Sequence, residues 1–115
     1  MNEIKRPSHF FVTSIDWKED KLGKYRAPQC CAGYTDNFKE AEEAVFEDIG
    51  DLSEGGSNEY VVIEEYYMGV FAMLVNTGDK YNEWWYHWKS SGGHEGKYER
   101  CEKPEWSEGI CRWSL

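Results

Sequence analysis

A row of carboxylates is the feature of this sequence with the clearest chemical potential. Between residues 35 and 67 the chain carries eleven Asp and Glu residues against a single cation, Lys39. The formal net charge of the whole chain is −9, so almost all of its excess negative charge lies in this segment. Five of the acids recur at steps of three or four residues, the spacing that places side chains on one face of a helix: Glu40, Glu43, Glu47, Asp51 and Glu54.

Three interpretations of this acidic row are open. It can serve solubility alone, because runs of charge are usually solvated surfaces. It can be a docking face for a basic protein, since complementary charge steers partners together and raises the association rate. It can also imitate nucleic acid, because helix carboxylates at these steps lie about 5–6 Å apart, close to the phosphate spacing of one strand. Acids near the C-terminal end of the helix, such as Glu47 and Asp51, oppose the helix dipole, which favours an interaction role.

An aromatic segment at residues 83–89 (EWWYHWK) is the second candidate site. Alternate residues of a strand face opposite sides, so every second ring of this segment shares a face. Tyr and Trp are frequent anchors in protein interfaces, because they bury a large area and keep a polar tip. We therefore predict that partner binding through the acidic row is assisted by three residues of one face, Trp84, Tyr86 and Trp88.

Two alternative functions follow from the same aromatic segment. Its rings could stack on a nucleotide while an arginine binds the phosphate, which would make the protein a nucleotide-sequestering module. The arginines available for this are Arg26, Arg100 and Arg112. The rings could equally form a patch through which two copies of the chain pair as a structural homodimer. The negative net charge counts against the nucleotide alternative.

Catalytic and metal-binding patterns are weak in this sequence. It contains no P-loop, no G-x-G-x-x-G, no G-x-S-x-G and no H-E-x-x-H, so we expect no enzyme activity and no cofactor. The cysteines lack the C-x-x-C spacing of structural zinc sites, and the histidines His9, His87 and His94 are dispersed. We therefore expect no metal site and interpret the cysteines as small buried apolar residues: Cys30, Cys31, Cys101 and Cys111.

The order of strand and helix signals predicts the fold class. Asn37 followed by Glu40 is a capping-box pattern, and apolar residues at three- and four-residue steps, Phe38, Ala41, Val45, Ile49 and Leu52, predict one helical face packed on a sheet. We predict strands at residues 10–17, 29–34, 59–67, 83–89 and 97–103. The strand at 59–67 is expected at the centre of the sheet, because it is apolar on both faces, and the strand at 97–103 at an edge. Further short elements are predicted at 69–75 and 110–115, and a turn-rich link at 76–82. Residues 18–28 and 90–96 are predicted to be loops. The prediction is a single α+β domain over residues 1–115, with a mostly antiparallel twisted sheet of about five strands and one acidic amphipathic helix on one face.

Length and composition limit the partners and the compartment. A chain of 115 residues with 40% hydrophobic and 17% aromatic residues is sufficient for one folded core. The negative balance argues against direct binding to nucleic acid or to an anionic membrane. No apolar run is long enough for a signal peptide or a spanning helix, so we expect a cytoplasmic protein with reduced thiols.

The order of these signals resembles a family of small acidic proteins from bacterial, phage and mobile-element genomes. The resemblance rests on Gly33-Tyr34 before NFKEAEEAV at residues 37–45, then YVVIEE at residues 60–65 and the tryptophan-bearing WYHW at residues 85–88. It covers most of residues 33–104 and implies a fold, without catalytic residues. Small acidic proteins of such genomes are often inhibitors of host enzymes or defence systems. The resemblance therefore implies an inhibitor, and together with the acidic row it predicts a non-enzymatic protein that binds a basic host protein, such as a nucleic-acid-binding defence enzyme.

Overall fold

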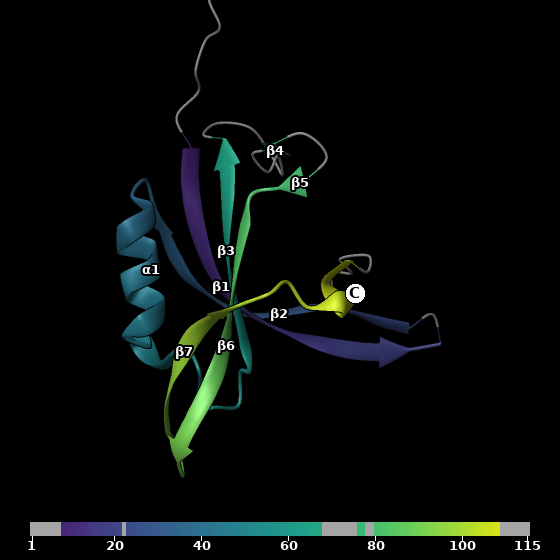
Figure 1. Cartoon of the computed structure of the whole chain (residues 1–115), viewed down its shortest axis with the longest axis vertical. Helices are drawn as coiled ribbons and strands as arrows, with labels where there is room; N and C mark the ends of the chain where they lie inside the picture. The colour runs from purple at the N-terminus through teal and green to yellow at the C-terminus, as the bar shows by residue number, and fades with distance from the viewer. Residues whose placement is uncertain (1–7, 22, 68–75, 78–79, 109–115) are drawn as a thin grey trace, which may run out of the picture.

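The chain folds as an α+β domain built on one antiparallel sheet (Figure 1). The computed structural model describes residues 8–21, 23–67, 76–77 and 80–108. Within this part the sheet has five strands in the order β2-β1-β3-β6-β7, and every neighbouring pair is antiparallel. Its strands are β1 (Ser8–Asp20), β2 (Gly23–Thr35), β3 (Tyr60–Tyr67), β6 (Glu83–Gly92) and β7 (Glu95–Cys101). The predicted fold class is confirmed.

Strand β3 is the centre of the sheet, as its sequence predicts. It pairs with β1 on one side and with β6 on the other. Three consecutive residues, Val61, Val62 and Ile63, have no exposed surface. A strand covered on both faces reads as a continuous apolar run, which explains why apolar residues here do not alternate with polar ones.

The β1–β2 hairpin is longer than the sequence predicts, and the loop expected at residues 18–28 is wrong. Both strands continue beyond the point where β1 stops pairing with β3, and their own ladder runs to the Asp20–Gly23 pair. Gly23 has a φ of 113°, which suits the tight turn there. Pro28 is tolerated because β2 is an edge strand and Pro28 lies beside one of two register shifts in the ladder. Ser14 satisfies the backbone at this irregularity, since its hydroxyl accepts from the Cys30 N–H and donates to the Cys30 carbonyl.

The second hairpin, β6–β7, also replaces an expected loop. Residues 90–96 extend the two strands and close through a turn at Gly93 and His94. The edge position predicted for residues 97–103 is confirmed by β7. Two short strands, β4 (Asn76–Thr77) and β5 (Lys80–Tyr81), pair with each other in the predicted link. The elements predicted at 69–75 and 110–115 lie outside the described residues.

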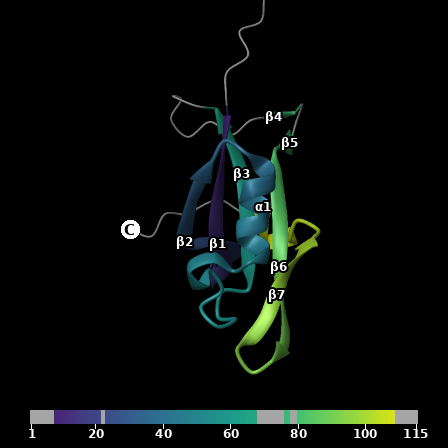
Figure 2. The ribbon, with the colours of Figure 1, turned by 90° about the vertical axis from the view of Figure 1, so that its left-hand side faces the viewer.

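One α-helix, α1 (Phe38–Phe46), lies across one face of the sheet in the described part of the chain (Figures 1 and 2). The main core forms beneath it. Its fully buried members include Val45, Val61 and Tyr86, with Phe10, Phe38, Trp84 and Trp88 packed around them. No helix of the described residues is long and apolar enough to cross a membrane.

The opposite face of the sheet has a smaller core. Trp85 packs there with Ile15 and Val62, and Trp106 of the 3-10 helix η2 (Glu105–Glu108) lies at 89° to the Trp85 ring. The chain leading to η2 is held by Lys103, whose Nζ lies 3.0 Å from Oε1 of the buried Glu83. This face is therefore partly covered by the end of the described chain.

Candidate functional site

The N-terminus of α1 is fixed as the capping pattern predicts. Asn37 has extended backbone angles, and its Oδ1 accepts a hydrogen bond from the Glu40 N–H at 3.1 Å. Thr35 at the end of β2 accepts from the Asn37 N–H. These contacts start the helix immediately after β2, so the first turn of α1 lies beside the edge strand.

The helix ends earlier than the acidic spacing predicts. Glu47 is its C-cap, and Asp48 adopts left-handed angles with a φ of 49°. Asp48 then fixes the next turn, because its two carboxylate oxygens accept from the Ser53 N–H and from the Ser53 hydroxyl, both at 2.7 Å. The 3-10 helix η1 (Ile49–Asp51) follows with a kink at Gly50. The single long helix predicted through residue 54 is therefore wrong.

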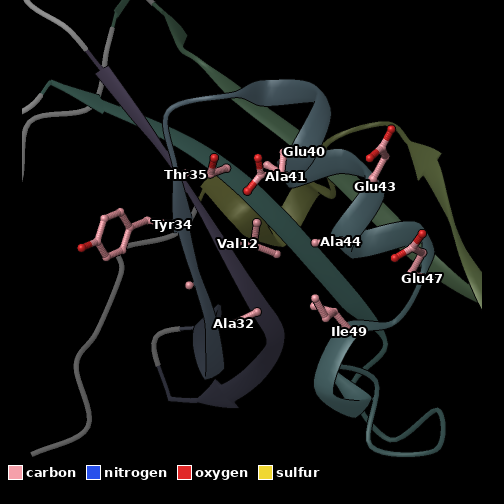
Figure 3. A pocket seen from close by; sticks show the side chains of 11 residues that line it. Val12, Ala32, Tyr34, Thr35, Glu40, Ala41, Glu43, Ala44, Glu47 and Ile49 are labelled. Atoms are coloured by element: carbon pink, nitrogen blue, oxygen red, sulfur yellow. The ribbon is translucent and has the colours of Figure 1, made fainter.

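A groove lies between α1 and the edge strand β2 (Figure 3). Its volume is about 270 Å³. Its apolar part is formed by Val12 at the base, Ala41 and Ala44 on the helix, Ala32 on β2 and Ile49 at one end. Tyr34 reaches the groove only through its backbone, because its ring points away from the helix in Figure 3 and packs against His9 and Phe11. We call this feature the acidic groove, for the glutamates described next.

Small residues explain why the groove is open. The flank of α1 toward β2 carries Ala41 and Ala44, and Gly33 occupies the facing part of the strand. None of these residues has a side chain long enough to close the gap. Ile49 was predicted to lie in the core but has 51% of its surface exposed, because the helix ends before it. The isoleucine therefore adds exposed apolar surface to the mouth of the groove.

Three of the five predicted acids line this groove. Glu40, Glu43 and Glu47 are exposed and belong to its lining. In Figure 3 the Glu40 side chain extends toward Thr35, while Glu43 and Glu47 point outward from the helix. No side chain in the described part of the chain forms an ion pair with any of the three. They form a rim of uncompensated negative charge beside an apolar hollow.

The other two predicted acids lie elsewhere. Asp51 and Glu54 follow the end of α1, have φ angles of 55° and 48°, and do not line the groove. The Asp51 carboxylate accepts from the Gly55 N–H at 3.2 Å, so it serves the turn. The continuous five-residue row is thus corrected to a group of three, because the backbone turns where the spacing assumed a helix.

A different glutamate organises the opposite flank of α1. Glu42 accepts hydrogen bonds at its Oε2 from the Tyr86 hydroxyl at 2.5 Å and from Arg100 Nε at 2.6 Å. Burial and the hydrogen bond to Glu42 raise the pKa of Tyr86 well above its ordinary value, so the tyrosine is a neutral donor. These contacts fasten the helix to β6 and β7. We call them the β7-side cluster.

The aromatic segment belongs largely to the core. Tyr86 has no exposed surface, so its predicted contact with a partner is wrong. Trp84 and Trp88 are partly buried and pack against the same core. Their shared face was predicted correctly, but it is the face that α1 covers. Trp85, on the other face, is only 3% exposed.

The remaining chemical groups do not converge. Cys30 and Cys31 are exposed on β2, in contrast to the burial predicted for them, while Cys101 is partly buried and Cys111 lies outside the described residues. No group of three His, Cys, Asp or Glu residues in the described ranges could hold a metal ion. Of the arginines considered for a nucleotide phosphate, Arg100 is held by Glu42, whereas the Arg26 side chain and Arg112 are not described.

Comparisons with protein-family models, with curated proteins and with solved structures found no match. The candidate site is therefore assigned from the geometry of the structure alone. Sequence reasoning found Glu40, Glu43 and Glu47 but missed the groove beside them. The available signal was the pair of alanines, Ala41 and Ala44, on the helix flank that follows an edge strand.

Proposed function

We propose that this protein is a non-enzymatic interaction protein that binds a basic partner protein through the acidic groove. The observation that carries the proposal is the position of Glu40, Glu43 and Glu47, which are exposed without a described counter-ion beside an apolar hollow. Carboxylates that only serve solubility need no such neighbour.

The two parts of the groove would contribute differently to binding. The carboxylates would attract a positively charged surface and increase the association rate, an effect that salt weakens. The apolar lining, including the half-exposed Ile49, would supply affinity when it is removed from water, at roughly 25 cal/mol per Å². A partner that matches both parts must carry positive charge next to an apolar side chain.

The more specific form of the proposal is an inhibitor of phage or mobile-element origin. Its target would be a nucleic-acid-binding defence enzyme, because such enzymes present basic surfaces to phosphates. This form is supported by the sequence resemblance and by the negative charge of the groove. It requires that binding of the protein and binding of nucleic acid to the target exclude each other.

The test compares capture of partners from a bacterial lysate by three forms of the tagged protein. The groove variant carries Glu40→Lys, Glu43→Lys and Glu47→Lys. The matched control carries Glu95→Lys, Glu99→Lys and Glu102→Lys, an equal change of charge at exposed residues away from the groove. We expect a basic protein to bind the wild type and the control in low salt, and to be lost from the groove variant.

Two outcomes would contradict the proposal. If the groove variant retains the partner as well as the wild type does, the groove is not the binding surface. If both variants lose the partner equally, only the overall charge matters. For the inhibitor form, the captured enzyme is then titrated with its nucleic acid, which must displace the protein.

A further inference from the structure

We propose, on the basis of the proposed function, that the acidic groove recognises a short basic segment of the partner that inserts one large apolar side chain. This inference specifies the ligand chemistry of the site: an anchor residue such as Leu, Phe or Trp, flanked by Lys or Arg. It is carried by the size of the hollow, by its apolar lining and by the positions of the three rim glutamates.

The size of the groove fits a single anchor. Its volume is about 270 Å³, and it is open to solvent. For comparison, an apolar cavity of about 150 Å³ is enough to hold benzene. One aromatic or branched aliphatic side chain can therefore enter between Ala44 and Val12, in contact with Ile49, while the rest of the segment stays at the surface.

The charges specify what flanks the anchor. Glu40 and Glu47 are seven residues apart on or at the end of α1, which corresponds to a span of about 10 Å along the helix axis. Glu43 lies between them. An anchor inserted from outside would thus have carboxylates along the helix side of the groove, within reach of long Lys or Arg side chains that extend from neighbouring positions.

The same geometry argues against imitation of nucleic acid. A row that ends at Glu47 matches only about two phosphate steps, because the remaining acids, Asp51 and Glu54, belong to the following turns. Imitation of phosphates also does not require an apolar hollow beside the carboxylates. The shape of the site is better explained by an inserted side chain.

Addition of a strand to the edge of the sheet is also disfavoured. Strand β2 has two register shifts in its ladder, and Pro28 removes one backbone donor. Such irregularities protect an edge strand against pairing with another chain. Recognition by a side chain in the groove does not require a regular edge.

The first experiment is a selection of random peptides against the full-length protein at physiological ionic strength. We expect an enriched pattern with one obligatory large apolar position flanked by Lys or Arg. Replacing the apolar residue of an enriched peptide by Gly should weaken its binding at least about tenfold, since burial of such a side chain contributes about 1.5–3 kcal/mol. Fluorescence anisotropy with the labelled peptide measures the affinity.

Variants of the protein locate the binding site. Ala44→Leu fills the hollow without changing charge, and we expect it to reduce peptide affinity by about tenfold. Ile49→Ser removes the apolar end at an exposed position, so it tests the same contact if Ala44→Leu perturbs folding. Glu43→Gln with Glu47→Gln should weaken binding mainly at low salt, and Glu95→Gln with Glu99→Gln is the matched control.

The inference is overturned if no peptide is enriched, if the enriched peptides are basic without an apolar position, or if Ala44→Leu and Ile49→Ser both leave affinity unchanged. Its failure differs from that of the proposed function. If capture of the partner requires Glu40, Glu43 and Glu47 but is unchanged by Ala44→Leu, the proposed binding of a basic partner stands. The inserted apolar anchor is then rejected.

Discussion

The two flanks of α1 use the same kind of residue in opposite ways. On the β7 side, Glu42 has a side chain that is 21% exposed and accepts from both Tyr86 and Arg100. On the β2 side, Glu40, Glu43 and Glu47 are exposed and form no ion pair with any side chain that the structure describes. On one flank the carboxylate binds the helix to the sheet, and on the other flank three carboxylates remain exposed to solvent.

The hollows beside the two flanks differ in the same sense. The one on the β7 side has a volume of about 490 Å³ and is lined by Phe46, Lys97, Tyr98, Glu99 and Arg100. Its charges are of both signs, and Lys97 and Arg100 already lie near acidic partners. The acidic groove has charge of one sign only. The larger hollow is thus the weaker candidate, because its cations are already close to acidic residues of the same molecule.

Truncation of Glu42 should have the largest effect on folding. Glu42→Ala leaves the Tyr86 hydroxyl, which lies in the core, without its acceptor, and a hydrogen bond to a charged group contributes about 1.5–3 kcal/mol. We expect the free energy of unfolding to fall by about 2 kcal/mol in urea denaturation. A loss below about 0.5 kcal/mol would show that the β7-side cluster does not hold the helix.

The hydroxyl of Tyr86 should make the protein sensitive to alkaline pH. Burial and Glu42 raise its pKa in the folded state above the ordinary value of 10.0, so folding favours the protonated form. Its contribution to stability is complete below about pH 10 and declines as the pH rises above that value. Tyr86→Phe should lower stability by about 1 kcal/mol at neutral pH.

The difference in the free energy of unfolding between the wild type and the Tyr86→Phe variant should decrease above pH 10. The variant retains part of the alkaline loss, because burial also raises the pKa of Tyr98. Urea unfolding at a series of pH values checks this. A gap that stays constant to the highest pH would contradict the assigned role of the Tyr86 proton.

A substitution in the turns after α1, at Glu54, should increase the stability of the protein. Glu54 has a φ of 48°, a left-handed conformation that costs a residue with a Cβ about 1 kcal/mol. Glu54→Gly removes this strain, and we expect stability to rise by up to about 1 kcal/mol without any change in partner capture. Reduced capture would mean that Glu54 belongs to the binding surface.

The smallest effects on stability are expected on the groove side. Glu43→Ala should change the free energy of unfolding by less than about 0.5 kcal/mol, because the exposed Glu43 side chain forms no hydrogen bond or ion pair with the residues that the structure describes. Glu47→Lys should stabilise by a few tenths of a kcal/mol, since a cation suits the C-terminal end of the helix. Urea denaturation of both variants beside Glu42→Ala measures the contrast directly. A destabilisation as large as that of Glu42→Ala would remove the distinction between the flanks.

The elements predicted correctly were those whose local and long-range signals agree. The cap at Asn37 needs only a side chain and a nearby N–H. The central position of β3 follows from an apolar run that has to be covered on both faces. The shared face of Trp84, Tyr86 and Trp88 follows from strand alternation.

The features predicted wrongly depend on local backbone conformation and on topology, which the spacing of residues does not reveal. The acidic spacing continues through Asp51, but the backbone reverses at Asp48, where an aspartate tolerates the left-handed conformation and bonds to Ser53. Pro28 led to the prediction of a loop, because the sequence does not reveal that this proline lies on an irregular edge strand. The role of Tyr86 depends on which face the helix covers, which is a property of the topology.

The most direct test of the central claim uses the two exposed apolar residues that α1 and its C-terminal turn present on opposite flanks. Ile49, at the acidic groove, is 51% exposed, and Phe46, on the β7 side, is 45% exposed. Each is replaced in turn by the photoreactive amino acid benzoylphenylalanine, and the protein is irradiated with its partner in a bacterial lysate. Cross-linking of a basic protein at position 49 but not at position 46 is the predicted result. Cross-linking at position 46 alone, or at neither position, would contradict the assignment of the acidic groove as the binding surface.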